Sequence, residues 1–280
     1  MWTFNYDSPA EISRLLSASS LAMTKKFGQN FLISRQARER IADLIASSSP
    51  SLVWEIGPGI GAITSLLLKR GIAVRAFEID HGFCQILTAQ AFGDEPRFTL
   101  VEGDALKTLF AQRDVPSIVC GNLPYNVGSQ CIARLIENGM LPDRMVFTLQ
   151  KEVVERMCAS PSSPSWSSFS VLTQLDYENR MAFTIPRGSF YPSPNVDSAL
   201  VVMDKRREPL VEADLRPVFL DTVRALFAQR RKTVRNNLAG AGYSCQRIDD
   251  VLSAVHLSGQ ERAETFDFAT LRAIAAALRG

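Results

Sequence analysis

The strongest constraint on the fold is a regular alternation of two sequence patterns between residues 52 and 159. Short apolar runs are followed by segments whose apolar residues recur every three to four positions. The expected strands cover residues 52–57, 73–80, 97–104, a run from Ile118, and 144–150, and the expected helices cover residues 62–71, 83–92, 129–139 and 151–159. Such alternation predicts an α/β fold with a mostly parallel sheet covered by helices on both faces.

The pattern changes after this region. Residues 160–170 are rich in Ser and Pro, which indicates a loop, and residues 205–209 are typical of a linker. Helices are then expected over residues 215–238, 246–255 and 267–278. We therefore expect a large Rossmann-like α/β domain over residues 1–206 and a small all-helical domain over residues 207–280.

A glycine-rich turn, EIGPGIG, joins the first expected strand to its helix and contains Gly57 and Gly59. Backbone N–H groups in such a turn can approach a ligand closely. Glu78, Asp104 and Asn122 each end one of the next strands, where ligands bind in open α/β sheets. A tight turn and ordinary helix caps would explain each feature singly, but their coincidence favours a nucleotide pocket.

The spacing of the glycines narrows the choice of ligand. The turn lacks the G-x-G-x-x-G spacing of dinucleotide sites, and no G-K-[ST] sequence follows it, so a phosphate-binding loop is not expected. Glu78 can accept both ribose hydroxyls, and Asp104 can accept from an adenine amino group. These features favour S-adenosyl-L-methionine, a ligand with adenosine and an amino acid but no phosphate, with S-adenosyl-L-homocysteine as the product.

The sequence GNLPYN follows the strand that begins at Ile118. If the Asn122 side chain and the Leu123 carbonyl accept both hydrogens of an adenine amino group, the nitrogen lone pair becomes more localised and more nucleophilic. Pro124 restricts the backbone of Leu123, and Tyr125 can stack on the base, which is worth about 1–3 kcal/mol. An ordinary turn is the alternative interpretation of these four residues.

The order of motifs resembles that of one enzyme family. The motifs are KKFGQNFL, EIGPGIGAIT, FEID, EGDAL, GNLPYNV, LQKEVVERM, FYPSPNVDSALV and FAQRRKTVRNNL. They resemble the bacterial small-subunit (16S) rRNA adenine N6,N6-dimethyltransferase family, the kasugamycin-susceptibility methyltransferases, over nearly the whole chain. The resemblance implies two adjacent adenosines in the 3′-terminal hairpin of 16S rRNA as the substrate, within a pre-30S ribosomal particle.

The resemblance also implies residue roles. It implies that Phe190 helps Tyr125 to hold a flipped base. The implied contacts to S-adenosylmethionine are Asn30, Leu32, Gly57, Glu78, Asp104 and Asn122. One departure from the family pattern is PSWSSFS, in which Trp166 and Ser167 replace a tyrosine and a glycine. This departure predicts a differently shaped loop near the target base.

The expected helix 215–238 is basic. Its apolar residues form one stripe, and Arg224, Arg231 and Arg235 fall along the edge of that stripe. Together with Lys232 they predict phosphate contacts to rRNA, although a solvated charged face is the usual explanation of such a cluster. Arg230 falls inside the apolar stripe, so we expect either a kink near Gln229 or an ion pair for Arg230.

Bulk composition excludes several classes. The net charge is only +2, and His81 and His256 are the two histidines, so no metal site is expected. The five cysteines are scattered, which is typical of reduced thiols in a cytoplasmic protein. Apolar runs are too short to cross a bilayer, and we expect a monomer.

Two alternatives to the leading interpretation stay open. A 23S rRNA adenine N6-methyltransferase of the macrolide-resistance type would share the glycine loop and the acids, but typically has Ile in place of Leu123 and lacks the tail motif. An RNA-binding factor of ribosome assembly, with only secondary methylation activity, is the non-enzymatic alternative.

Overall fold

The computed structural model describes residues 2–19, 30–124 and 127–280. It divides into two compact units: Met1–Val154 with Asn179–Lys205, and Glu155–Glu178 with Arg206–Gly280. The second unit thus resumes at Arg206 and also contains the earlier segment Glu155–Glu178.

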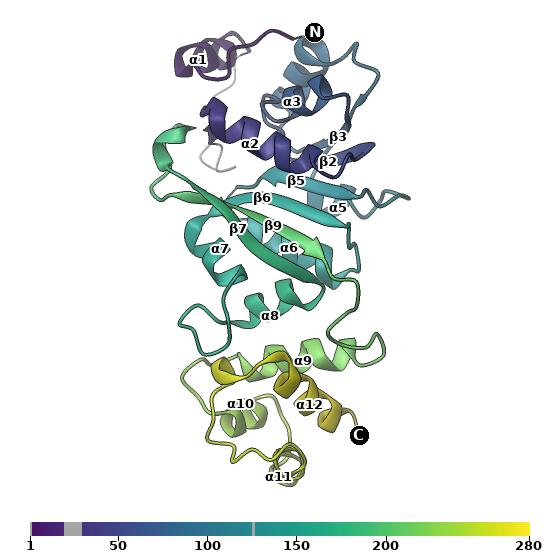
Figure 1. Cartoon of the computed structure of the whole chain (residues 1–280), viewed down its shortest axis with the longest axis vertical. Helices are drawn as coiled ribbons and strands as arrows, with labels where there is room; N and C mark the ends of the chain where they lie inside the picture. Colours follow the sequence, from purple (N-terminus) through teal and green to yellow (C-terminus); the bar gives the residue numbers. More distant parts are fainter. Residues whose placement is uncertain (1, 20–29, 125–126) are drawn as a thin grey trace. The chain divides into compact units, whose positions relative to one another are not determined.

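The first unit is built on a seven-stranded sheet with the order β4-β3-β2-β5-β6-β9-β7 (Figure 1). Its strands are β2 (Leu52–Ile56), β3 (Ala73–Glu78), β4 (Phe98–Glu102), β5 (Ile118–Asn122), β6 (Arg144–Gln150), β7 (Tyr177–Ile185) and β9 (Ser198–Lys205). The pairs β2–β3, β3–β4, β2–β5 and β5–β6 are parallel, and β9 is antiparallel to β6. The five strands expected from the alternation form the parallel part, as predicted.

Strand order reverses between β2 and β5. From β2 the chain adds β3 and β4 on one side and later adds β5 and β6 on the other. The reversal leaves a crevice beyond the carboxyl ends of these strands, which is where open α/β sheets bind ligands. Buried apolar residues such as Ile45, Leu67 and Val202 join helices and strands in one core that fixes this edge.

Helices connect the strands. The helices are α1 (Pro9–Ala18), α2 (Arg35–Ala46), α3 (Thr64–Lys69), α4 (His81–Gln85), a π-helical turn Ile86–Ala91, α5 (Ala105–Thr108), α6 (Gly128–Glu137) and α7 (Lys151–Met157). Of these, α1, α2, α4 and α5 begin at polar caps. Ser8 caps α1 by accepting from the Glu11 N–H, as its sequence predicts. The expected helix 83–92 is instead one turn of α-helix followed by the π-helical turn.

A small second sheet lies in the first unit. Strand β1 (Phe31–Leu32) pairs antiparallel with β8 (Phe190–Tyr191), and Leu32 faces Phe190 in register. The Ile33 N–H donates to the carbonyl of Ser189, in the 3₁₀ turn Arg187–Ser189. Residues 156 to 160 positions apart in sequence are thereby held together, which positions Asn30 just before β1.

The second unit contains α8 (Ser168–Leu175), α9 (Arg216–Leu226), α10 (Val234–Gly240), α11 (Cys245–Ala254), a 3₁₀ turn Ala263–Thr265 and α12 (Phe268–Arg279). Trp166 and Val171 are buried in one apolar core with Phe219 and Leu226, and the Trp166 indole N–H donates to the Phe266 carbonyl (3.1 Å). This packing explains why residues 155–178 belong to the second unit.

The prediction of a single helix over residues 215–238 is wrong. The structure ends α9 at Leu226 and starts α10 at Val234, with Thr233 as the N-cap. Asn237 bridges the break, because its side-chain nitrogen donates to the carbonyls of Leu226 (2.7 Å) and Gln229 (3.2 Å). The Leu226 carbonyl is one that the end of a helix leaves without an intrahelical partner, and Gln229 lies in the connection to α10. No helix in the described part of the chain has the length and apolarity that crossing a bilayer requires.

Candidate active site

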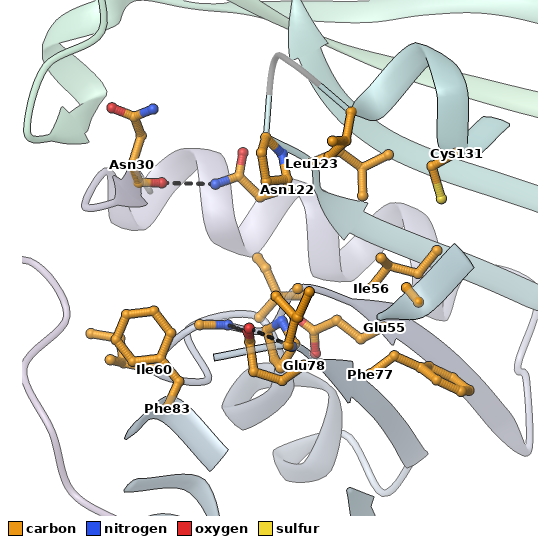
Figure 2. Close-up of a pocket in the computed structure, with 18 of the residues that line it drawn as sticks. Asn30, Glu55, Ile56, Ile60, Phe77, Glu78, Phe83, Asn122, Leu123 and Cys131 are labelled. Atoms are coloured by element: carbon orange, nitrogen blue, oxygen red, sulfur yellow. Dashed lines mark hydrogen bonds between the residues drawn. The ribbon is translucent and has the colours of Figure 1, made fainter. Parts of the chain in front are cut away.

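A cavity of about 390 Å³ lies in the first unit at the carboxyl ends of β2, β3, β4 and β5. The predicted residues that line it are Asn30, Leu32, Gly57, Gly59, Glu78, Asp104, Asn122, Leu123, Pro124 and Phe190. Tyr125 lies outside the described residues. Figure 2 shows Asn122 and Leu123 on one side of the cavity and Glu78 on the opposite side. The structure thus brings together positions that are up to 160 residues apart in sequence.

The glycine turn after β2 forms one wall. Gly57 and Gly59 have φ angles of +66° and +57°, in the left-handed region that glycine adopts without steric cost. The Gly57 N–H donates to the Phe77 carbonyl (2.9 Å), which continues the pairing of β2 with β3. The Gly59 N–H donates to the Glu78 carboxylate (3.1 Å). The turn and the acid of the next strand therefore fix each other.

Glu78 ends β3 and is only 6% exposed. One carboxylate oxygen accepts from Gly59 and the other from the N–H groups of Ile79 and Asp80, both at 2.9 Å. Burial raises the pKa of Glu78 to about 7, although the three backbone donors favour the ionised form. Glu78 is not a helix cap, because Asp80 caps α4.

Asp104 caps a helix, which was the alternative interpretation of its position in the sequence. Its carboxylate accepts from the Leu106 N–H (3.0 Å) and caps α5. It also lines the cavity. One carboxylate can do both, since each oxygen has two acceptor positions.

The amide of Asn122 is oriented by the backbone of a distant segment. Its side-chain nitrogen donates to the Asn30 carbonyl (2.9 Å), as the dashed line in Figure 2 shows. Its oxygen Oδ1 accepts from no residue that the structure describes. The Leu123 N–H donates to the Thr148 carbonyl (3.2 Å), so the peptide after Asn122 is anchored to β6. The side chain of Leu123 is buried.

One charged residue of the cavity has no role in the sequence interpretation. Glu55, in β2, lines the cavity and is 2% exposed. The Thr64 hydroxyl donates to its Oε2 (2.6 Å). Burial and the nearby charge of Glu78 raise the pKa of Glu55 to about 7. The sequence did mark Glu55 as unusual, because it lies inside the apolar strand LVWEIG. Burying a carboxylate there destabilises the folded protein unless the carboxylate has a partner or a function.

The charges on the wall have one sign. Glu55, Glu78 and Asp104 line the cavity, and among the lining residues that the structure describes there is no Lys, Arg or His. Such a wall disfavours phosphate groups and favours a cation. Apolar side chains, including Ile79, Phe83 and Leu106, supply most of the remaining surface.

The predicted RNA-binding residues of the second unit differ in their partners. Arg224 pairs with Asp221 (2.8 Å) and Arg235 with Asp249 (2.6 Å). Arg231 and Lys232 are exposed and form no ion pair with any residue in the described part of the chain. Of the predicted cluster, these two cations are therefore the free ones.

Both expectations for Arg230 are confirmed. The helix breaks before it, and its guanidinium pairs with Glu264 (3.2 Å) and donates to the Pro164 carbonyl. Trp166, which stands where the family pattern has a tyrosine, is buried in the core of the second unit.

The histidines and cysteines form no cluster. His81 is exposed and its Nδ1 lies 2.8 Å from Glu102. Within the described ranges, no group of three or more His, Cys, Asp or Glu side chains is placed to hold a metal ion. All five cysteines are free thiols, and Cys84, Cys120 and Cys131 are buried.

The sheet order and the glycine-walled cavity define the class of Rossmann-like methyltransferases. Two solved structures share this fold. A dimethyladenosine transferase from Plasmodium falciparum has a TM-score of 0.71 at 21% identity, covering 86% of this chain and 94% of its own. The 23S rRNA methyltransferase ErmE has a TM-score of 0.66 at 22% identity, covering 89% and 99%.

The chain belongs to the ribosomal RNA adenine dimethylase family, whose model matches residues 21–272. Among curated relatives, the ribosomal RNA small subunit methyltransferase A of Treponema denticola is 43% identical over 95% of this chain and 94% of its own length. The protein of that name from Listeria monocytogenes serotype 4b is 38% identical, over 93% and 92%. The family predicted from the motifs is thus confirmed, and with it an rRNA adenine dimethyltransferase that depends on S-adenosylmethionine.

Proposed function

We propose that this chain transfers methyl groups from S-adenosylmethionine to the N6 amino groups of two adjacent adenosines in the 3′-terminal hairpin of 16S rRNA. It acts on a pre-30S ribosomal particle in the cytoplasm, as a monomer. The observation that carries this proposal is the cavity: a wall whose charged residues are all acidic, which suits a cationic, phosphate-free nucleoside, with the Asn122 amide and Leu123 opposite. The curated relatives, named for the small ribosomal subunit, support the choice of RNA.

The residues of the cavity divide into two groups by position. Gly57, Gly59 and Glu78 hold the donor, with Glu78 accepting from the ribose hydroxyls. Asp104 accepts from the adenine amino group of the donor. Asn30 and Leu32 close the cavity from β1, and Asn30 also fixes the Asn122 amide.

The second group positions the target base. When bound, S-adenosylmethionine supplies an electrophilic methyl group, so neither a metal nor a strong base is needed. Asn122 Oδ1 and the Leu123 carbonyl would accept the two N6 hydrogens, which would localise the N6 lone pair. In each transfer the methyl group would pass from sulfur to N6, which would leave a neutral thioether, and N6 would lose one proton to water. Pro124 narrows the conformations of Leu123, and Phe190 and Tyr125 hold the base. Catalysis is then mainly alignment.

Binding of rRNA requires cations, and the free ones in the predicted cluster are Arg231 and Lys232. We propose that these two contact phosphates, while Arg224 and Arg235 contribute less because each already has a carboxylate partner. Phosphate contacts position an RNA without reading its sequence.

Incubation with labelled S-adenosylmethionine tests the proposal. Unmodified 30S particles, 50S particles and naked rRNA serve as separate substrates, and mass spectrometry locates the product. We expect two dimethyladenosines in the 3′-terminal hairpin of the 30S RNA. Label in 50S particles would favour the 23S type of methyltransferase, and binding to 30S particles without label would favour an assembly factor.

A further inference from the structure

The loop between β7 and β9 carries two exposed side chains to which the proposed function assigns no role. Arg187 begins the 3₁₀ turn before β8 and is exposed to solvent. Val196 is 45% exposed, although most large apolar side chains in the described ranges are buried. The Oδ1 of Asp197, the residue after Val196, accepts from the Arg187 N–H (2.9 Å). The loop therefore places a cationic side chain and an exposed apolar side chain on neighbouring stretches of backbone.

Hydrogen bonds fix the backbone around Arg187 but leave its side chain free. The Arg187 carbonyl accepts from the Ser193 hydroxyl (3.0 Å) and from the N–H of Phe190. The Asp197 carbonyl accepts from the Lys151 N–H (3.0 Å), which joins the loop to the start of α7. The Arg187 guanidinium has no hydrogen-bond or ion-pair partner among the residues that the structure describes. A free guanidinium on a fixed backbone is preorganised for an anionic ligand.

The same turn leads into the wall of the cavity. Phe190, three residues after Arg187, lines the cavity and is 3% exposed. The charged residues of the described wall are Glu55, Glu78 and Asp104, and such a wall disfavours phosphate. A nucleotide whose base enters the cavity therefore keeps its phosphates outside. Arg187 provides a cation outside the cavity, on the element that carries Phe190.

We propose that Arg187 and Val196 form a subsite for the nucleotide next to the target adenosine. The Arg187 guanidinium binds the phosphate between the two nucleotides, because its paired N–H groups match two phosphate oxygens. Val196 packs against the neighbouring base, as apolar side chains do where the stacking of bases is interrupted. The inference rests on the proposed function, because it takes an RNA adenosine as the target. Neither contact reads the identity of a base, so the subsite accepts whichever nucleotide adjoins the adenosine in the cavity.

Steady-state methylation of 30S particles tests the subsite. Arg187→Ala should raise KM for 30S particles by about tenfold with kcat unchanged, because a phosphate contact made on binding persists in the transition state. Affinity for S-adenosylmethionine, measured by calorimetry, should not change. Val196→Ala should raise the same KM by about twofold to threefold. Arg113→Ala is the matched control, because Arg113 is exposed, has no ion-pair partner among the described residues, and precedes β5 at the edge of the sheet opposite the cavity.

A neutral linkage in the RNA identifies the contact. Particles are reconstituted with 16S rRNA in which a methylphosphonate replaces, one at a time, the phosphates that flank and join the two adenosines. At one position the replacement should raise KM of the wild type by about tenfold and leave that of Arg187→Ala unchanged. Additive penalties at every position, as contact of Arg187 with a ribosomal protein would give, overturn the inference, and so does an unchanged KM in Arg187→Ala. Failure of the wild type to methylate particles with natural linkages would instead overturn the proposed function.

Discussion

The cavity of the first unit and the basic segment of the second unit both carry charged residues, but they are built in different ways. In the cavity, Glu78 and Asn122 are fixed by hydrogen bonds to backbone groups. In the basic segment, Arg224 and Arg235 are fixed by other side chains on the surface, and Arg231 is fixed by none in the described part of the chain.

This difference shows which charged side chains can be located in the structure from their positions in the sequence. Packing leaves few conformations to a side chain at the end of a buried strand, so its position in the sequence predicts its position in space. An arginine on a short surface helix can reach several partners, and exposed ion pairs contribute only about 0–1 kcal/mol. We therefore expect substitutions in the cavity to have large effects and those in the basic segment to have small ones.

Asn122→Ala should give the largest effect. A small effect would contradict the expected difference between the cavity and the basic segment. Loss of the Oδ1 acceptor should lower kcat/KM for methyl transfer by about 10²–10³-fold, as removal of one preorganised polar group does elsewhere. Binding of 30S particles should be unchanged. Asn138→Ala, at the exposed end of α6, is the matched control and should keep normal activity. Near-native dimethylation by Asn122→Ala would show that the proposed alignment is wrong.

Asn237→Ala extends the comparison to the second unit, where one buried amide behaves like those of the cavity. Its loss leaves the Leu226 carbonyl without its side-chain donor and removes one of the two donors to the Gln229 carbonyl, which also accepts from the Lys232 N–H. The cost should be about 2 kcal/mol. Hydrogen exchange of α9 and α10 should accelerate by about 30-fold at that cost, whereas the exposed neighbour Asn236→Ala should leave it unchanged. Equal exchange in both variants would rule out the bridge as a stabilising contact.

The pH dependence of stability sharpens the comparison within the cavity. Glu55 has a pKa of about 7 when folded, above its ordinary value of 4.5. Between these values the folded protein binds more protons than the unfolded chain, so stability falls as pH rises. Glu55→Gln should remove about 1 kcal/mol per pH unit of this decline between about pH 5 and pH 7. Urea unfolding measures it, with Glu137→Gln on the exposed end of α6 as the control. Parallel curves for wild type and Glu55→Gln would contradict the burial of this charge.

The sheet and the cavity were largely predictable from sequence, for a physical reason. Parallel strands that are buried on both faces are apolar along their length, so the polar residue that ends each one stands out. Glu78, Asp104 and Asn122 were found in this way. Glu55 was not assigned a role, because it is the first residue of the motif EIGPGIG, in which the glycines carry the prediction. Its position inside an apolar strand was nevertheless informative.

The second unit was less predictable, because its features depend on contacts between distant residues. No Gly or Pro between Leu226 and Val234 signals the break that Asn237 stabilises. The Ser/Pro-rich composition of residues 160–170 indicated a loop but not that Trp166 within it is buried and donates to the Phe266 carbonyl. Composition describes the average of a segment, and one aromatic residue can anchor it to a core.

Salt dependence gives the smallest effect and tests the basic segment directly. If Arg231 and Lys232 each neutralise one phosphate, replacing both by Ala should reduce the slope of log K against log salt for 30S binding by about 1.4 to 1.8. Arg224→Ala with Arg235→Ala removes the same charge from sites that already have carboxylate partners, and should reduce the slope by less than about half of that amount. Filter binding at several salt concentrations measures both. Because the two double variants have the same net charge, a difference between their slopes reports which cations meet phosphate, and an equal reduction would mean that the ion pairs open when RNA binds.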